Sequence, residues 1–311
     1  MYKILIMGSG FVGQATGKSL SKLGHDVIFC DTDERKLRNL ESEGFKTCRE
    51  KNLEEISPDI IFLTVPTPTK NGQVDLKFIH SAAKSVASKI IKRANNIPLV
   101  VVKSTVPPGT TEHSIIPILE TYSQKKSGQD FETAMNPEYL RERFAVKDFE
   151  NPRLILIGSN TKRAREMLCK LYDPYAKKCQ IVSVTPKEAE MQKYVHNLWN
   201  ATKISFFNEI RALSEKTGIN PDAIFRLTIK SAEASWNPEY GIRNFGPYGG
   251  SCLPKDTVAF LHWSKNHAQT DLPLLRSVIK VNENLRKELA QPKISSAQPA
   301  IGDKMHEIRN N

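Results

Sequence analysis

The chain has 311 residues, 39% hydrophobic and 25% charged, with a formal net charge of +11 and a pI near 9.3. Two domains with cores of their own fit this length, and the apolar run at residues 2–7 is too short for a signal peptide or a membrane span. Dispersed basic residues argue against a nucleic-acid interface, although their positive field would attract anionic nucleotides.

The cysteines are odd in number and scattered without the spacing of metal ligands. This pattern predicts free thiols in a reducing compartment, and therefore a cytoplasmic protein with no metal site. They are Cys30, Cys48, Cys169, Cys179 and Cys252.

The N-terminal residues predict a dinucleotide-binding unit. The apolar run at residues 2–7 reads as a strand, and it leads directly into Gly8-Ser9-Gly10-Phe11-Val12-Gly13. A helical pattern follows, and residues 26–31 read as a second strand that ends in Asp31. The order of strand, glycine turn, helix, strand and acid is the complete fingerprint.

Each glycine of this fingerprint has a physical role. Gly8 allows the tight turn, Gly10 lets a pyrophosphate approach the backbone, and Gly13 lets helix and strand pack closely. The helix N-terminus then faces the phosphates.

The acid at the end of the second strand predicts the cofactor. Asp31 is placed to accept hydrogen bonds from a ribose 2′-hydroxyl and would repel a 2′-phosphate, which favours NAD over NADP. Arg35 and Lys36 weaken that preference, and Arg35 is a further candidate cofactor contact.

Strands and helices alternate to about residue 185, which predicts a doubly wound parallel sheet. Buried-strand runs stand at residues 60–65, 99–102 and 154–157. The loops at residues 65–69 and 103–110 carry prolines and hydroxyls, and either line the cofactor or are plain rigid turns. If the two loops line the cofactor, the residues that contact it are expected to be Pro66, Thr67, Ser104 and Thr105.

A long helix is predicted from Thr185-Pro186 to about Thr217-Gly218. Lys193 and Asn197 are four residues apart and share one face of it. An ammonium beside an amide can stabilise an oxyanion, but a solvated lysine beside a surface amide gives the same pattern.

The glycine-rich loop at residues 249–256 contains a candidate nucleophile. A thiol attacks as its thiolate, and Lys255 together with the glycines could favour that form of Cys252. The same loop is compatible with a structural turn that holds a small buried cysteine.

These motifs together resemble the UDP-glucose and GDP-mannose dehydrogenases, over about residues 1–288. They occur in the order of that family: residues 8–13, 65–68, 103–107, 136–142, Lys193 with Asn197, and 249–256.

The resemblance implies an N-terminal Rossmann domain at residues 1–185 that binds NAD. An all-α central domain at 186–290 would carry the catalytic cysteine and form a homodimer through the long helix. A polar tail at 291–311 is expected to be disordered.

The resemblance also implies oxidation of a nucleotide sugar's C6 alcohol to a carboxylate with two NAD molecules used in turn. Cys252 would hold the aldehyde as a thiohemiacetal and then as a thioester. Lys193 and Asn197 would hold the oxyanion, Asp256 and Thr105 would position water or relay protons, and Glu138 would act as base in hydrolysis. Substrate binding is implied for Glu138, Tyr139, Leu140, Arg141, Glu142, Lys193, Asn197, Tyr248 and Gly249. Further cofactor contacts are implied for Phe11, Val12, Glu142 and Lys255.

The chain departs from the family pattern in two places. Family members continue with a second Rossmann-like domain that helps to cradle the nucleotide, whereas this sequence continues as a polar tail, so we expect that half of the site to be missing. Residues 235–248 replace an Arg-Ile-Gly segment whose arginine reaches the partner's sugar site, and Arg243 is a candidate substitute in a different register.

Three functions follow from these observations. The first is a nucleotide-sugar dehydrogenase, with UDP-glucose favoured as substrate. The second is a two-electron NAD-dependent dehydrogenase on another substrate, which would need neither Cys252 nor Glu138. The third is a non-catalytic NAD-binding remnant.

Overall fold

The computed structural model describes residues 1–71, 73–232, 237, 246–250 and 253–290. The chain divides into two units, of which the first holds Met1–His196 and the second begins at Asn197. No helix in the described part of the chain is both long enough and apolar enough to cross a membrane.

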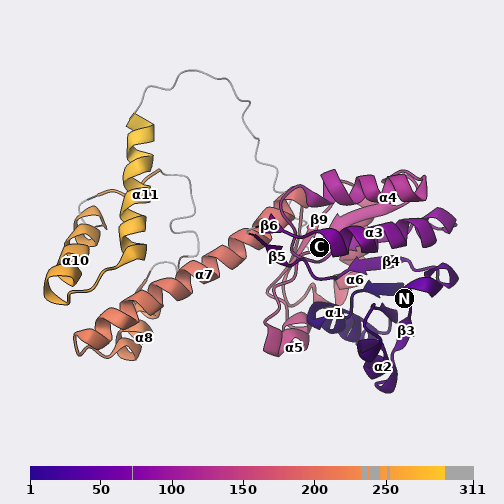
Figure 1. Ribbon diagram of the computed structural model, residues 1–311, viewed down its shortest axis with the longest axis horizontal. Coiled ribbons are helices and arrows are strands. Elements are labelled where there is room, and N and C mark those ends of the chain that lie inside the picture. Colours follow the sequence, from indigo (N-terminus) through magenta and orange to yellow (C-terminus); the bar gives the residue numbers. More distant parts are fainter. Residues whose placement is uncertain (72, 233–236, 238–245, 251–252, 291–311) are drawn as a thin grey trace. The chain divides into compact units, whose positions relative to one another are not determined.

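The first unit is built on an eight-stranded sheet with the order β10-β9-β8-β7-β4-β1-β2-β3 (Figure 1). Neighbouring strands are parallel except β8 and β9, which are antiparallel with Met135 opposite Gly158. The predicted doubly wound α/β fold is confirmed, and the reversal at β9 is a departure from a wholly parallel sheet. The strands are β1 (Lys3–Met7), β2 (Asp26–Cys30), β3 (Lys46–Cys48), β4 (Ile60–Leu63), β7 (Leu99–Val102), β8 (Glu132–Met135), β9 (Leu154–Gly158) and β10 (Gln180–Val184), with a separate hairpin of β5 (Thr69–Lys70) and β6 (Gln73–Val74).

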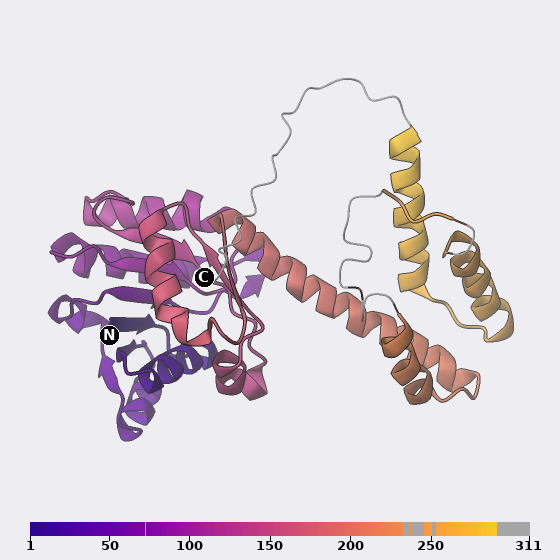
Figure 2. The same cartoon turned by 180° about the vertical axis from the view of Figure 1, so that it is seen from behind.

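Helices cover both faces of this sheet, as Figures 1 and 2 show. In β1, Leu5 packs into a core that includes residues of α3 and α4, while Ile4 and Ile6 pack into a second core with residues of α1 and α6. Strands buried on both faces read as continuous apolar runs, which explains the sequence pattern. The helices are α1 (Phe11–Lys22), α2 (Glu34–Ser42), α3 (Lys77–Lys89), α4 (Ile116–Ser123), α5 (Ala145–Glu150) and α6 (Lys162–Tyr172), with short helical turns at Glu50–Glu55, Ile91–Arg93, Thr111–Ile115, Glu142–Phe144 and Asp173–Tyr175.

The helix α7 (Pro186–Lys216) has 31 residues, as the sequence predicted, and it continues from the first unit into the second. A capping box fixes its start, because Thr185 Oγ1 accepts from the Glu188 backbone N–H at 3.3 Å and the Glu188 carboxylate accepts from the Thr185 N–H at 2.8 Å. Proline at the first helical position lacks an N–H that would have no intrahelical partner there.

The second unit continues with α8 (Pro221–Ser231), α10 (Leu253–His267) and α11 (Pro273–Ala290). Asn220 caps α8 by accepting from two backbone N–H groups. The Phe207 and Phe225 rings, 4.8 Å apart, join α7 to α8. The Glu209 carboxylate on α7 accepts from the N–H groups of Leu274 and Leu275, and so caps the start of α11.

The buried carboxylate of Glu190 ties the second turn of α7 to the loop after β7. Glu190 is fully buried and accepts hydrogen bonds from the backbone N–H of Gly109 and from both the N–H and the hydroxyl of Thr111, the last two at 2.8 and 2.6 Å. Burial raises the pKa of Glu190, and these hydrogen bonds oppose that rise. The loop that carries Ser104 and Thr105 is therefore held against α7.

We expect Glu190→Gln to lower the free energy of unfolding by roughly 1–3 kcal/mol, because one amide NH2 would face a buried N–H donor. Glu188→Gln is the matched control, since Glu188 is an exposed capping residue of the same helix and its loss costs about 1 kcal/mol or less. Urea unfolding followed by circular dichroism measures both, and equal losses would contradict the role of Glu190.

Candidate active site

The glycine loop between β1 and α1 forms one wall of a cavity of about 590 Å³ at the carboxyl edge of the sheet. Gly8 has φ +101°, and a Cβ there would lie 2.8 Å from the Val65 nitrogen. A Cβ on Gly13 would lie 2.0 Å from the Gly8 carbonyl oxygen, whereas one on Gly10 would meet nothing within 4 Å. Gly8 and Gly13 therefore pack too closely against neighbouring backbone to carry a side chain, whereas Gly10 leaves open the space that a pyrophosphate would fill.

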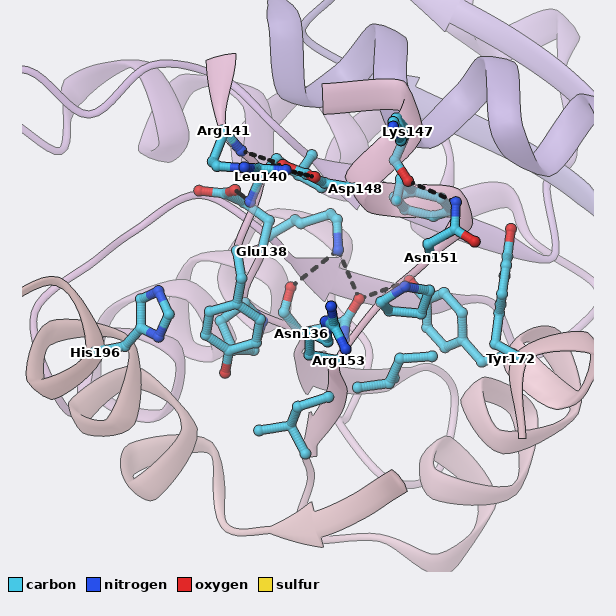
Figure 3. A pocket seen from close by; sticks show the side chains of 18 of the residues that line it. Asn136, Glu138, Leu140, Arg141, Lys147, Asp148, Asn151, Arg153, Tyr172 and His196 are labelled. Carbon is cyan, nitrogen blue, oxygen red and sulfur yellow. Dashed lines mark hydrogen bonds and ion pairs between the residues drawn. The ribbon is translucent and has the colours of Figure 1, made fainter. Parts of the chain in front are cut away.

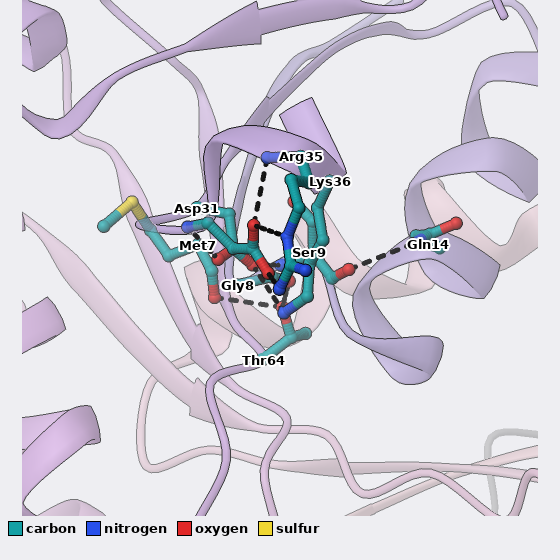
Figure 4. Close-up of polar contacts among 9 residues, drawn as sticks. Met7, Gly8, Ser9, Gln14, Asp31, Arg35, Lys36 and Thr64 are labelled. Atoms are coloured by element: carbon teal, nitrogen blue, oxygen red, sulfur yellow. Dashed lines mark hydrogen bonds and ion pairs between the residues drawn. The ribbon is translucent and has the colours of Figure 1, made fainter. Parts of the chain in front are cut away.

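Asp31 holds this loop from the end of β2 (Figure 4). Its Oδ2 accepts from the Ser9 N–H at 2.6 Å, its Oδ1 accepts from the Asp33 N–H at 2.9 Å, and Lys36 Nζ lies 3.4 Å from Oδ2. Asp31 and Lys36 both line the cavity, while Arg35 pairs with Asp33 and is not among the lining residues. The geometry fits a dinucleotide whose ribose hydroxyls would donate hydrogen bonds to the Asp31 carboxylate.

The loops after β4 and β7 form the opposite wall and bind each other. Thr67 Oγ1 donates to the Thr105 carbonyl at 2.7 Å, and Ser104 Oγ donates to the Val65 carbonyl at 2.6 Å. Thr64 Oγ1 donates a hydrogen bond to the Gly8 carbonyl at 2.7 Å, which joins the end of β4 to the glycine loop. The predicted cofactor-lining residues therefore lie around one cavity: Gly8, Gly10, Phe11, Val12, Asp31, Pro66, Thr67, Ser104 and Thr105.

The turn that follows β8 brings Glu138 to α7. Lys193 Nζ donates to the Glu138 carbonyl at 2.5 Å and lies 3.1 Å from Glu138 Oε1, while Oε2 accepts from the Leu140 N–H at 2.6 Å. The side chains of this ion pair are only 6% and 11% exposed. Lys193 is therefore not a solvated surface lysine, since its ammonium is held beside a carboxylate that lines the cofactor cavity.

A second cavity of about 500 Å³ is also lined by Glu138 (Figure 3). Two charged residues, Lys103 and Glu138, line both cavities. The Tyr139 and His196 rings contact each other in its wall, tilted by 54° with their centres 4.8 Å apart, and burial raises the pKa of Tyr139 and lowers that of His196. Arg141 forms an ion pair with Asp148 at 2.7 Å, which closes the turn on itself.

The remaining predicted residues fall into three groups. Cys252 and Arg243 lie outside the described residues, and the structure does not describe the side chains of Glu142, Lys255 and Asp256. Asn197, Tyr248 and Gly249 belong to the second unit. There the Tyr248 carbonyl accepts from Asn282 at 3.1 Å and Arg286 at 2.9 Å, so α11 anchors the start of the cysteine loop.

Three residues of the site had no assigned role in the sequence prediction. Lys103 and Asn136 belong to recognised motifs but were given no part of their own, and Gln192, which bonds the Tyr139 hydroxyl, was not considered. Among the described residues, no group of three or more His, Cys, Asp or Glu could hold a metal.

The fold and the glycine cleft define a dinucleotide-binding protein of the Rossmann class. Residues 2–58 and 45–176 match the NAD binding domain of the UDP-glucose/GDP-mannose dehydrogenase family, and residues 187–284 match the central domain. The chain therefore belongs to this family, and its cofactor is NAD.

Individual relatives agree with this membership. GDP-mannose 6-dehydrogenase of Pseudomonas syringae pv. tomato is 33% identical over 302 residues, which are 90% of this chain and 68% of the relative. UDP-glucose 6-dehydrogenase of Rickettsia prowazekii is 37% identical over 307 residues, covering 90% and 66%. The ternary-complex crystal structure of GDP-mannose dehydrogenase from Pseudomonas aeruginosa superposes with a TM-score of 0.85 at 30% identity, covering 92% of this chain and 69% of that one.

The three glycines give a test of the cofactor cleft. Gly10→Ala should leave thermal stability unchanged, since its Cβ meets nothing, but should weaken NAD binding by about tenfold or more because the methyl group occupies the pyrophosphate space. Gly13→Ala should instead lower the melting temperature, because its Cβ overlaps the Gly8 carbonyl. Calorimetric titration with NAD and thermal melts separate the two effects, and undiminished NAD binding by Gly10→Ala would contradict the assignment.

Proposed function

We propose that the chain is a nucleotide-sugar 6-dehydrogenase that oxidises the C6 alcohol of UDP-glucose to the carboxylate through a covalent intermediate on Cys252. The observation that carries the proposal is the Lys193–Glu138 pair, a buried ammonium and carboxylate at the edge of the NAD cleft. Oxidation of an alcohol to an aldehyde or ketone needs no hydrolytic base, whereas release of an acid from a thioester does.

NAD, when bound, accepts two electrons in each of the two oxidations. Gly10 and Asp31 would hold its pyrophosphate and ribose. The loops with Thr67 and Ser104 would shape the rest of the cleft, whose lining also includes Thr105 and Glu138.

The chain's own chemistry would centre on Cys252, which the sequence places in a glycine-rich loop. Its thiolate would add to the aldehyde carbon, which prevents escape of the aldehyde before the second oxidation. After that oxidation, water would add to the thioester carbon, the C–S bond would break, and the products would be the carboxylate and the free thiolate.

Lys193 and Glu138 would divide the work of hydrolysis. Lys193 donates to the Glu138 carbonyl and forms an ion pair with the Glu138 carboxylate. Its ammonium would also donate to an oxyanion, together with the Asn197 amide. The Glu138 carboxylate would take the proton of the attacking water, and Asp256 would assist proton transfer. The backbone of residues 138–142 and Arg243 would contribute to binding of the sugar.

The preference for UDP-glucose over GDP-mannose is the finer part of this proposal. A UDP-glucose relative is 37% identical to this chain and a GDP-mannose relative 33% identical. Free thiols at Cys30, Cys48, Cys169 and Cys179 fit a cytoplasmic enzyme.

The number of NADH molecules formed per sugar tests the reaction. With UDP-glucose we expect two NADH per sugar, with GDP-mannose as the competing substrate in a parallel assay. Cys252→Ser should lower turnover by about a hundredfold or more, whereas Cys169→Ser, a half-buried thiol on α6, is the matched control and should retain activity. One NADH per sugar would indicate a two-electron dehydrogenase, and NAD binding without turnover on either sugar would indicate a non-catalytic protein.

We also propose that α7 forms a homodimer. Met191, Val195, Leu198 and Trp199 follow the i, i+4, i+7, i+8 spacing of one helix face, and Leu198 and Trp199 are 63% and 60% exposed. The buried residues Glu190 and Lys193 lie on the opposite side of the helix. An exposed apolar stripe of this kind is typical of a protein interface.

The dimer predicts a change of mass in solution. Leu198→Glu with Trp199→Glu should convert the dimer into a monomer, because burying two carboxylates in an apolar interface is unfavourable. Lys230→Glu, an exposed residue of α8, controls for the change of charge. Light scattering after size exclusion measures the mass, and a wild-type monomer, or a dimer that survives both substitutions, would contradict the proposal.

A further inference from the structure

Glu50 lines the end of the NAD cleft that lies farthest from Glu138 along the sheet. The strands whose carboxyl ends border the cleft follow the order β8-β7-β4-β1-β2-β3, with Glu138 after β8 and Glu50 after β3. Gly10, beside the pyrophosphate space, follows β1, and Asp31, which would bind the adenosine ribose, follows β2 (Figure 4). The adenine of a bound NAD would therefore lie beyond Asp31, on the side of Glu50.

One face of α3 lines the same cleft, mostly with small side chains. Phe78, Ser81, Ala82 and Ser85 follow the i, i+3, i+4, i+7 spacing of a single helix face, and all four line the cavity. The serine and alanine side chains leave room for a flat ring against the helix. A hydroxyl both donates and accepts, so the two serines do not choose between purines that differ in a donor and an acceptor.

Glu50 is fixed to this helix at two points. Its Oε1 accepts from the Ser85 hydroxyl, and its backbone carbonyl accepts from Lys89 Nζ at 2.9 Å, one turn further along α3. Ser85 is buried, and Glu50 is partly buried. Glu50 is therefore held in place at the wall of the cleft and is not a mobile surface acid.

The Glu50 carboxylate can accept further hydrogen bonds. A carboxylate is an acceptor only, with about four lone-pair positions on its two oxygens. The Ser85 hydroxyl takes one of these positions, and within the part of the chain that the structure describes no other group forms a hydrogen bond or an ion pair with this carboxylate. The side chain can therefore bind a donor that a ligand brings into the cleft.

We propose that Glu50 selects the base of the cofactor: its carboxylate accepts a hydrogen bond from the exocyclic 6-amino group of adenine. Hypoxanthine carries a carbonyl oxygen at that position, and two acceptors that face each other share no hydrogen and repel. Glu50 is then a specificity-determining residue at the end of the cofactor opposite to the nicotinamide. The inference concerns cofactor binding, and it does not rest on the covalent route through Cys252 or on the identity of the sugar nucleotide.

Nicotinamide hypoxanthine dinucleotide is the probe, because it differs from NAD only at this position of the base. Calorimetric titration of the full chain should give a dissociation constant about tenfold or more larger for this dinucleotide than for NAD. Glu50→Gln should lower the ratio of the two constants to about threefold or less, because a side-chain amide offers both a donor and an acceptor. The measurement needs no turnover, so a protein that makes no NADH from either sugar nucleotide can still be tested.

Glu55→Gln is the matched control. Glu55 is an exposed carboxylate of the same helical turn, Glu50–Glu55, and does not line the NAD cleft. Its substitution should leave the preference for NAD unchanged. Glu50→Asp is a second variant, which keeps the charge but withdraws the carboxylate by one methylene, and it should also lower the ratio. Equal binding of the two dinucleotides by the wild-type protein, a ratio that both Glu50 variants leave unchanged, or an equal loss of preference in Glu55→Gln would overturn the proposal.

Discussion

The attachment of the first turns of α7 to the carboxyl edge of the sheet is the interaction on which the site depends. Glu190 binds the loop after β7 through its carboxylate, and Lys193, one turn further on, binds the turn after β8 at Glu138. Two buried charges of opposite sign on one helix face thus hold the two loops that border the NAD cleft. Backbone N–H and C=O groups of irregular loops need partners when they are buried, and here one helix supplies them.

The local parts of this arrangement could be predicted from the sequence. The glycine fingerprint acts within a few residues, so Gly8, Gly10 and Gly13 have distinct roles that the printed residues already indicate. The capping box at Thr185 and Glu188 is equally local, and it marks where the long helix begins. Such features depend on spacing along the chain, which is what a single sequence records.

The nonlocal parts could not be predicted. Lys103 meets Asn136 across 33 residues, and Tyr172 meets the same amide across 36, so no spacing rule connects them. The apolar run at Leu154–Gly158 indicates a buried strand, but the same composition serves either direction of the strand, and its reversal becomes visible only in the pairing with β8. The burial of Lys193 likewise depends on tertiary packing. The spacing of a lysine four residues from an amide fits a solvent-exposed helix face equally well, so the sequence alone could not predict this burial.

The reversal of β9 has a consequence for how the segment between β8 and β9 can vary. In a parallel sheet every connection must run back over one face of the sheet, from the end of one strand to the start of the next. Because β9 is antiparallel to β8, the connection at residues 136–153 leaves and re-enters the sheet on the same side. That segment resembles a long hairpin loop, closed on itself by Arg141 and Asp148. Insertions or deletions beyond the anchored residue Glu138 would leave the strand order intact, so the length of this loop can vary without a change in the sheet.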